Sequence, residues 1–457
     1  MDWNNCFSGK RYGVETGPSE IRSEFERDYD RIIFSSAFRR LQNKTQVFPL
    51  PKHVFVHNRL THSLEVACIG RSLGKIVGAE ITKIKEVEQN KNVLDFYKDH
   101  LKNVISAACL AHDLGNPAFG HSGEEAISKH FLDKKDDKKF TSQFSVEEWD
   151  DLIKFEGNAN SLRVLTRKSS NNLDGGYRLT YSTLASIMKY PCAANESKGK
   201  KGPTHLKKYG YFQADKKVFD AITKEVKMIN DADNGNAFFR HPFTYLVEAA
   251  DDIAYNIIDF EDAHRLGILT TEEITSIFLD LLKLSKNDNF SKTQETATKL
   301  DSNPNEKISY LRAKAINFLT ISSAQVFIDN ADKIIKGEFE GSLVQKIPDA
   351  QTILEKIETI SVNRIYNHNS VVKIELAGFK IMSALISDFV EAVLMPKSER
   401  IKRHDKIIRL IPNQYLFNET NTSYEKVMCI LDLMSGMTDL YALELYRNLQ
   451  GISMPSI

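Results

Sequence analysis

The chain has 457 residues, of which 42% are hydrophobic and 27% charged, as is typical of a globular protein with a large core. Its 61 basic and 61 acidic residues cancel, so the net charge does not indicate a nucleic-acid-binding protein, although a local basic groove is compatible with it. No apolar run is long enough to cross a membrane, and the N-terminus lacks the apolar core of a signal peptide. Five scattered cysteines without a CxxC pair argue against a disulfide framework or a structural zinc site and predict a cytoplasmic protein.

Helical periodicity dominates the chain. Apolar residues recur at spacings of three and four, which predicts helices, over residues 32–41, 64–76, 243–260, 308–335 and 371–394. Alternating strand patterns are few and short. We therefore predict an all-α protein with at most a small hairpin.

Two polar stretches predict loops, at residues 195–205 and at residues 285–307. The second stretch would act as a linker between a catalytic region over residues 1–284 and a helical region over residues 308–457. The helical pattern continues on both sides of this stretch, so the boundary is a soft one.

The segment CLAHDLGNPAFGHSGEEA, residues 109–126, holds an unusual concentration of reactive side chains. An apolar helix over residues 104–110 would hold His112 and Asp113 at its end, where the last turn opens. Gly115 suits a left-handed helix cap and Pro117 cannot continue a helix, so both predict a turn. At the end of a helix, His112 and Asp113 can bind the same ion.

Two further ligands for such an ion are available elsewhere. His62 lies in NRLTHSLEVA, near the start of a predicted helix, and Asp251 or Asp252 lies inside another. Two imidazoles and two carboxylates suit a hard or borderline divalent ion such as Mn, Fe, Mg or Co. Each residue taken alone is more often structural than a ligand, so the prediction depends on the combination.

After the turn, His121 and Glu124 are three residues apart, which lets the carboxylate hydrogen-bond the imidazole and raise its pKa. Such a histidine can act as a general acid or base. The alternative interpretation is a helix N-terminus in which Glu124 occupies the favourable first turn. The two interpretations are compatible.

Together these motifs resemble a known family. NRLTHS, AHDLGNPAFGHSGE and EAADDIAY are similar to the HD superfamily of metal-dependent phosphohydrolases, and more narrowly to the bacterial deoxyguanosine triphosphate triphosphohydrolases (dGTPases). FRRLQNKTQVFPL, FEGNAN and SGMTDLYALELYRNL extend the resemblance over nearly the whole chain. It implies an all-α fold, with an HD-domain helical core over residues 1–284 and an additional helical C-terminal region that contributes to a base pocket and to oligomer contacts.

The resemblance assigns roles to the motif residues. It places the metal ligands at His62, His112, Asp113 and Asp251; Asp251 is preferred to Asp252 because the family's ligand precedes the site tyrosine by four residues. That tyrosine is Tyr255 here, and because four residues make about one helical turn, Asp251, Tyr255 and Asp259 would share one face of their helix. The resemblance assigns catalysis to His121 and Glu124. The implied cofactor is a divalent ion, Mn or Mg first, with Fe, Co or Ni as alternatives.

The remaining residues would bind the nucleotide. Tyr255 would pack against the sugar and exclude a 2′-hydroxyl, while Asp259 and Gln46 would receive the 3′-hydroxyl. Asn158, Arg59 and either Lys207 or Lys208 would contact phosphate. Glu375 matches the position that reads the guanine edge, and Arg409 is a looser match to a base-contacting arginine.

The implied reaction is hydrolysis of deoxynucleoside triphosphates, dGTP preferred, to deoxynucleoside and inorganic tripolyphosphate. One alternative is another HD phosphohydrolase, acting on cyclic nucleotides or (p)ppGpp, against which Gln46, Tyr255 and Asp259 argue. The other is a non-catalytic nucleotide- or nucleic-acid-binding HD protein, against which the complete ligand set argues. By resemblance, the partners are copies of the same chain in a hexamer and a single-stranded DNA effector, with no membrane.

Overall fold

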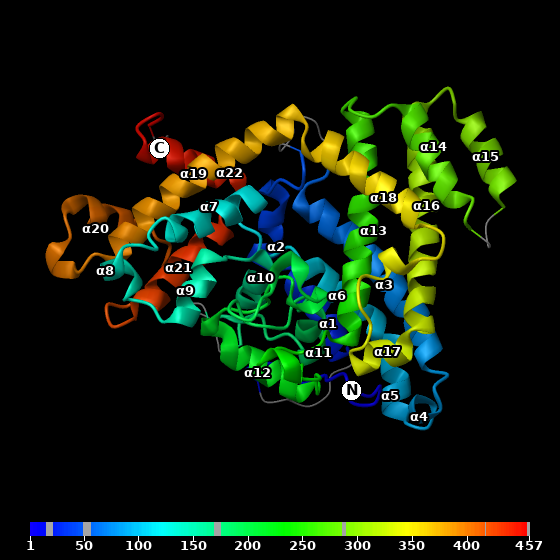
Figure 1. Ribbon diagram of the computed structural model, residues 1–457, viewed down its shortest axis with the longest axis horizontal. Coiled ribbons are helices and arrows are strands. Elements are labelled where there is room, and N and C mark those ends of the chain that lie inside the picture. The colour runs from blue at the N-terminus through cyan, green and yellow to red at the C-terminus, as the bar shows by residue number, and fades with distance from the viewer. Residues whose placement is uncertain (15–21, 49–55, 169–174, 286–288, 416, 455–457) are drawn as a thin grey trace.

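The computed structural model describes residues 1–14, 22–48, 56–168, 175–285, 289–415 and 417–454, and it is helical over most of them (Figure 1). Among these residues the β pairings are isolated bridges, Arg11 with Thr180, Thr45 with Asn58 and Asn230 with Phe238. The all-α prediction is therefore confirmed. Within the described chain no helix is long and apolar enough to cross a membrane.

The α-helices follow one another in a long series, joined by short loops and single 3₁₀ or π turns. In chain order they are α1 (Glu24–Ile33), α2 (Ser36–Arg40), α3 (Arg59–Ile81), α4 (Lys85–Glu88), α5 (Lys91–Asp95), α6 (Leu101–Ala111), α7 (His121–Leu132), α8 (Lys138–Thr141), α9 (Val146–Ile153), α10 (Gly157–Thr166), α11 (Tyr181–Ile187), α12 (Lys216–Glu225), α13 (Pro242–Arg265), α14 (Thr271–Leu282), α15 (Phe290–Lys299), α16 (Pro304–Asp329), α17 (Ala331–Lys336), α18 (Gln351–Ile360), α19 (Asn369–Leu394), α20 (Lys402–Arg409), α21 (Ser423–Gly436) and α22 (Asp439–Leu449).

Local capping explains where these helices begin. The Asn58 side chain accepts the Thr61 N–H at the start of α3, and the His241 imidazole accepts the Phe243 N–H at the start of α13. Capping also divides two segments predicted as single helices. Ser35 caps α2 within residues 32–41, and α16 ends at Asn330 within residues 308–335.

The polar stretch at residues 285–307 is not only a loop, contrary to the prediction. Asn289 caps α15, which turns Thr293 and Ala297 towards the interior. The stretch was predicted as a loop because so few of its residues are apolar. α16 begins within this stretch, at Pro304, and packs against α3 and α13, so helices on both sides of the predicted boundary share the first core described next.

The buried apolar side chains form two separate cores. The first is built by α1, α3, α6, α11, α13, α14 and α16, and the second by α7, α9, α19, α20 and α21. The helices α6 and α7 are consecutive but enter different cores. The turn between them, which is the segment His112 to His121, therefore lies where the two cores meet.

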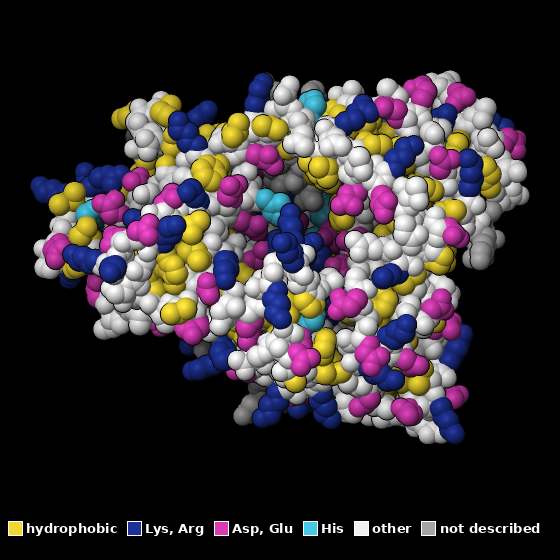
Figure 2. Space-filling view, viewed as in Figure 1, with side chains coloured by type: hydrophobic (Ala, Val, Ile, Leu, Met, Phe, Trp, Pro, Cys, Tyr) yellow, Lys and Arg dark blue, Asp and Glu magenta, His cyan; other side chains and the backbone are white. Residues whose placement is uncertain are grey.

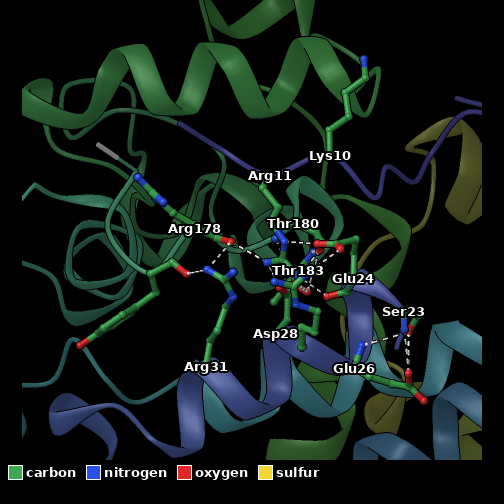
Figure 3. A network of polar contacts seen from close by, with 12 residues as sticks. Lys10, Arg11, Ser23, Glu24, Glu26, Asp28, Arg31, Arg178, Thr180 and Thr183 are labelled. Atoms are coloured by element: carbon green, nitrogen blue, oxygen red, sulfur yellow. Dashed lines mark hydrogen bonds and ion pairs between the residues drawn. The ribbon is translucent and has the colours of Figure 1, made fainter. Parts of the chain in front are cut away.

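A buried polar network fastens the N-terminal segment to the start of α11 (Figure 3). Asp28, which is fully buried, accepts hydrogen bonds from Arg11 (2.6 Å), from the Thr180 hydroxyl (2.6 Å) and from the Thr183 hydroxyl (2.7 Å). Since α11 leads directly to Lys189, the network holds one wall of the cavity described next.

Candidate active site and metal centre

A cavity of about 550 Å³ opens between the two cores. Figure 2 shows a hollow on this face with acidic and histidine side chains in and around it. The structure brings most of the predicted site residues to this cavity: Gln46, Arg59, His62, His112, Asp113, His121, Glu124, Asn158, Lys208, Asp251, Tyr255, Asp259 and Glu375. Lys207 and Arg409 are not among its lining residues.

The buried end of the cavity holds a cluster of metal-binding side chains. His62 comes from the first turn of α3, His112 from the end of α6 and Asp251 from the middle of α13. The Asp251 Oδ1 atom lies 3.1 Å from His62 Nε2 and 3.5 Å from His112 Nε2. The three candidate ligand atoms lie within 4.8 Å of one another, close enough to share one ion.

The hydrogen bonds of His112 show that the cluster fits a cation. Its Nδ1 lies 2.6 Å from the Cys109 carbonyl oxygen, so Nδ1 is the donor in this hydrogen bond and Nε2 is the nitrogen available to a metal. His112 Nε2 is buried and has no hydrogen-bond partner among the described residues. A divalent ion beside Asp251 would satisfy this atom and the nearby carboxylate together.

Asp113 lies next to the cluster with both oxygens engaged. Its Oδ2 accepts a hydrogen bond from Arg59 (2.6 Å) and its Oδ1 accepts one from Asn116. Burial alone would raise the pKa of Asp113, but the Arg59 charge outweighs it and holds that pKa well below its usual range. In this structure Arg59, predicted to contact phosphate, binds Asp113.

The His121–Glu124 pair stands at the exposed end of the cavity. The His121 side chain is 87% exposed, and its Nδ1 lies 3.0 Å from Glu124 Oε2. The other Glu124 oxygen accepts the Gly157 N–H at 2.8 Å. The hydrogen bond with Glu124 raises the pKa of His121 above its ordinary value. Burial opposes ionisation of Glu124, but its contact with His121 lowers its pKa nonetheless.

The turn between α6 and α7 differs from the prediction in one respect. Left-handed backbone occurs at Phe119 (φ 62°) and Gly120 (φ 57°), not at Gly115. Gly115 is instead required by space, because a Cβ there would lie 2.1 Å from the Gly157 carbonyl oxygen. The turn packs directly on the start of α10, where Ser161 accepts the Gly115 N–H at 3.0 Å.

The predicted sugar-binding residues share one side of the cavity. Asp251, Tyr255 and Asp259 lie one helical turn apart on α13 and all face the cavity, as their spacing indicated. Burial raises the pKa of Asp259 to about 7, and a hydrogen bond from the Tyr366 hydroxyl (2.9 Å) offsets this only in part. Gln46 has a buried Oε1 without a hydrogen-bond partner in the described chain.

Of the two candidate lysines, only Lys208 reaches the cavity. Its Nζ lies 2.8 Å from Glu156 Oε2, and Asn158 donates to the same carboxylate at 2.5 Å. Lys207 is exposed outside the cavity. The structure thus separates two lysines that the sequence left as alternatives.

Lys189 is a further cation that the sequence analysis missed. It lines the cavity after the end of α11, with its Nζ 3.2 Å from Glu248 Oε1. Burial would lower the pKa of Lys189, but Glu248 raises it above the ordinary value, so the side chain is charged. The only signal was a Lys-Tyr pair directly after an apolar helix. Tyr190 and Tyr366 also line the cavity and were missed.

The two residues predicted to read the base are not together within one chain. Glu375 lies at the cavity rim, on the exposed first turns of α19. Arg409 is exposed at the end of α20. The cavity of a single chain therefore contains the predicted carboxylate without the predicted arginine.

Comparison with known proteins identifies the family. The HD domain family matches residues 59–189, which include His62, His112, Asp113, His121 and Glu124. A deoxyguanosinetriphosphate triphosphohydrolase-like protein from Synechocystis sp. is 39% identical over 99% of this chain and its own full length. One from Pseudomonas aeruginosa is 35% identical over the full length of both, and the deoxyguanosinetriphosphate triphosphohydrolase of Yersinia pestis is 30% identical over 94% of both. The chain belongs to the deoxyguanosinetriphosphate triphosphohydrolase family.

Proposed function

We propose that this protein hydrolyses deoxynucleoside triphosphates, with dGTP preferred, to the deoxynucleoside and inorganic tripolyphosphate. The observation that carries the proposal is that one cavity holds both a His-His-Asp cluster and an exposed histidine backed by a buried glutamate. The first feature suits a phosphate-activating ion and the second suits proton transfer to a leaving group. The relatives' names give the substrate class.

His62, His112, Asp251 and the adjacent Asp113 would hold the divalent ion. When bound, such an ion withdraws charge from a phosphate and lowers the pKa of a nearby water. Imidazole and carboxylate ligands without a thiolate suit Mn or Mg, with Fe, Co or Ni as alternatives. The Cys109 carbonyl and Arg59 orient His112 and Asp113 before any ligand arrives.

His121 would supply the proton for the leaving group. Glu124 holds the His121 Nδ1–H, which leaves the Nε2–H free to point at the substrate. In the reaction, a water oxygen bonds to the α-phosphorus, the bond from phosphorus to the 5′-oxygen breaks, and His121 gives its proton to that oxygen. A proton released from the water restores His121. The hydrogen bond with Glu124 raises the pKa of His121, which favours the protonated imidazole that this role requires.

Side chains around these groups would bind the rest of the nucleotide. Lys208, Lys189 and Asn158 offer donors to the polyphosphate. Tyr255 and the Gln46–Asp259 pair would select the sugar, because a site that hydrogen-bonds one hydroxyl rejects analogues that lack it. Glu375 at the rim is the proposed acceptor for the guanine edge.

Assembly is a second part of the proposal. Leu376 on α19 and Leu440 and Tyr441 on α22 are apolar and exposed, and this favours a homo-oligomer, a hexamer by resemblance to the family. Arg409 would then meet the base only if a neighbouring copy presented it. A single-stranded DNA effector and a cytoplasmic location stay predictions.

One incubation tests the reaction against its alternatives. The protein is mixed with each dNTP and NTP in turn, with Mg or Mn, and the products are separated by ion exchange. Release of tripolyphosphate, fastest from dGTP, supports the proposal. Pyrophosphate or monophosphate indicates another HD phosphohydrolase, and nucleotide binding without any product indicates a non-catalytic protein.

A further inference from the structure

The junction of α21 and α22 contacts two walls of the cavity, although it lies far from them in sequence. Asp439, the first residue of α22, is 4% exposed. One of its oxygens accepts the Thr45 N–H at 2.8 Å and the other accepts the Phe119 N–H at 2.9 Å. A single carboxylate thus joins the segment before Gln46 to the turn before His121.

Lys44 makes the complementary contacts. It is 3% exposed, and its Nζ donates to the carbonyl oxygens of Asn116 (2.6 Å) and Ser435 (2.7 Å). Its own carbonyl accepts the N–H of Arg59, at the start of the helix that carries His62. Lys44 and Asp439 therefore fasten the turn at both ends, at Asn116 and at Phe119.

The fastened turn is strained. Phe119 has a left-handed backbone, which a bulky side chain adopts only where its surroundings enforce it. The Asp439 carboxylate accepts its N–H, and Gly378 of α19 lies against its side chain. The contact is so close that a Cβ on Gly378 would lie 2.4 Å from Phe119 Cβ. Gly120 and then His121 follow directly. The direction in which His121 leaves the turn thus depends on Phe119.

Helix capping does not account for Asp439. Thr438 is the N-cap of α22, and its side chain accepts the Tyr441 N–H at 3.2 Å. Asp439 is left free to accept the two distant amides. An asparagine of the same size would offer one acceptor and would turn an N–H₂ group towards a second N–H, so the carboxylate is chemically required.

We propose that Asp439, with Lys44, is a positioning residue that holds the His121–Glu124 pair at its working distance from the metal cluster and fixes Gln46 beside the sugar. The catalytic consequence rests on the proposed function, whereas the structural consequence does not.

The test compares Asp439→Asn with the control Thr438→Ala. The control weakens α22 through its cap but leaves both Asp439 contacts in place. Hydrogen exchange, followed by mass spectrometry over peptides covering residues 41–48 and 114–124, reports on the Thr45 and Phe119 amides directly. Steady-state kinetics with dGTP and with 2′,3′-dideoxy-GTP report on His121 and on Gln46.

For Asp439→Asn, we expect exchange of the two amides to accelerate at least tenfold. We expect kcat for dGTP to fall about 10²-fold, because misplacing a reacting group by about 1 Å costs roughly that much. The ratio of kcat/KM for dGTP to kcat/KM for 2′,3′-dideoxy-GTP should fall. The variant should still bind its metal. Thr438→Ala should show none of these changes, even where it lowers the melting temperature by as much as Asp439→Asn does. If Asp439→Asn does not fold, Lys44→Met should accelerate exchange over residues 114–124 and lower kcat.

Unchanged exchange over both peptides, or equal effects of Asp439→Asn and Thr438→Ala, would overturn the proposal. A wild-type protein that hydrolyses no dNTP would instead contradict the proposed function, and the exchange experiment would still decide the role of Asp439.

Discussion

The buried end of the cavity is formed by α3, α6 and α13, which share the first core, whereas the rim at Glu375 is formed by the exposed start of α19. At the buried end, His62, His112 and Asp251 are fixed by packing and by hydrogen bonds before any ligand binds. At the rim, neither Glu375 nor Arg409 is held by the apolar cores. Under the proposed function, each chain would carry the reacting groups in its buried core, while recognition of the base would depend on exposed side chains.

The largest expected effect comes from the buried end. Asp251→Asn should remove metal binding and reduce dGTP hydrolysis by about 10⁴-fold or more, because an amide cannot replace the charge of a carboxylate ligand. Asp252→Asn is the matched control, since Asp252 does not line the cavity and burial raises its pKa to about 7. Metal content by mass spectrometry checks the prediction, which fails if both variants retain one ion per chain.

His121→Ala should separate proton transfer from metal binding. We expect kcat to fall about 10²–10⁴-fold, the usual contribution of a general acid, while metal content and dGTP affinity stay near wild type. His130→Ala on the same helix, outside the cavity, serves as the control. Loss of metal in His121→Ala would contradict separate roles for the metal cluster and for the His121–Glu124 pair.

Glu375→Gln tests the rim. Because a charged hydrogen bond to guanine would weaken, we expect the kcat/KM for dGTP to fall about tenfold and that for dTTP to change little. Equal losses for all four dNTPs would show that Glu375 does not read the base.

The smallest effect concerns stability and pH. His57 precedes α3 and contacts Asp262 on α13 (2.9 Å) and Glu65 (3.2 Å). Burial opposes its protonation, but the two carboxylates raise the pKa of His57 to about 10. Because this exceeds the ordinary value of about 6.5, the stabilisation is fully present below pH 6.5 and is lost as the pH rises through 10.

Compared with His57→Gln, the wild type should be more stable to urea by about 1–3 kcal/mol at pH 6, and this difference should shrink by pH 10. A difference independent of pH would show that packing, not charge, joins α3 to α13 at this point.

Sequence reasoning succeeded where short-range patterns determine the structure. Helical periodicity predicted α3, α13 and α19, and a spacing of four predicted that Asp251, Tyr255 and Asp259 share one face. It failed at α15, whose polar sequence buries only Thr293 and Ala297.

Contacts between residues far apart in the chain could not be predicted from the sequence either. Asp439 meets Thr45 across 394 positions, and nothing near either residue indicates the other. The Lys-Tyr pair at Lys189 did not indicate a cavity residue, because its partner, Glu248, comes from a distant helix. Gly115 was assigned to a left-handed cap, whereas its neighbour across space, Gly157, determines the need for glycine.

The most direct test of the account is hydrolysis of dGTP in ¹⁸O-labelled water, with the products identified by mass spectrometry. Attack of water on the α-phosphorus, with proton donation by His121 to the 5′-oxygen, predicts tripolyphosphate that carries one ¹⁸O atom and unlabelled deoxyguanosine. Labelled deoxyguanosine, dGMP with pyrophosphate, or no product would contradict it.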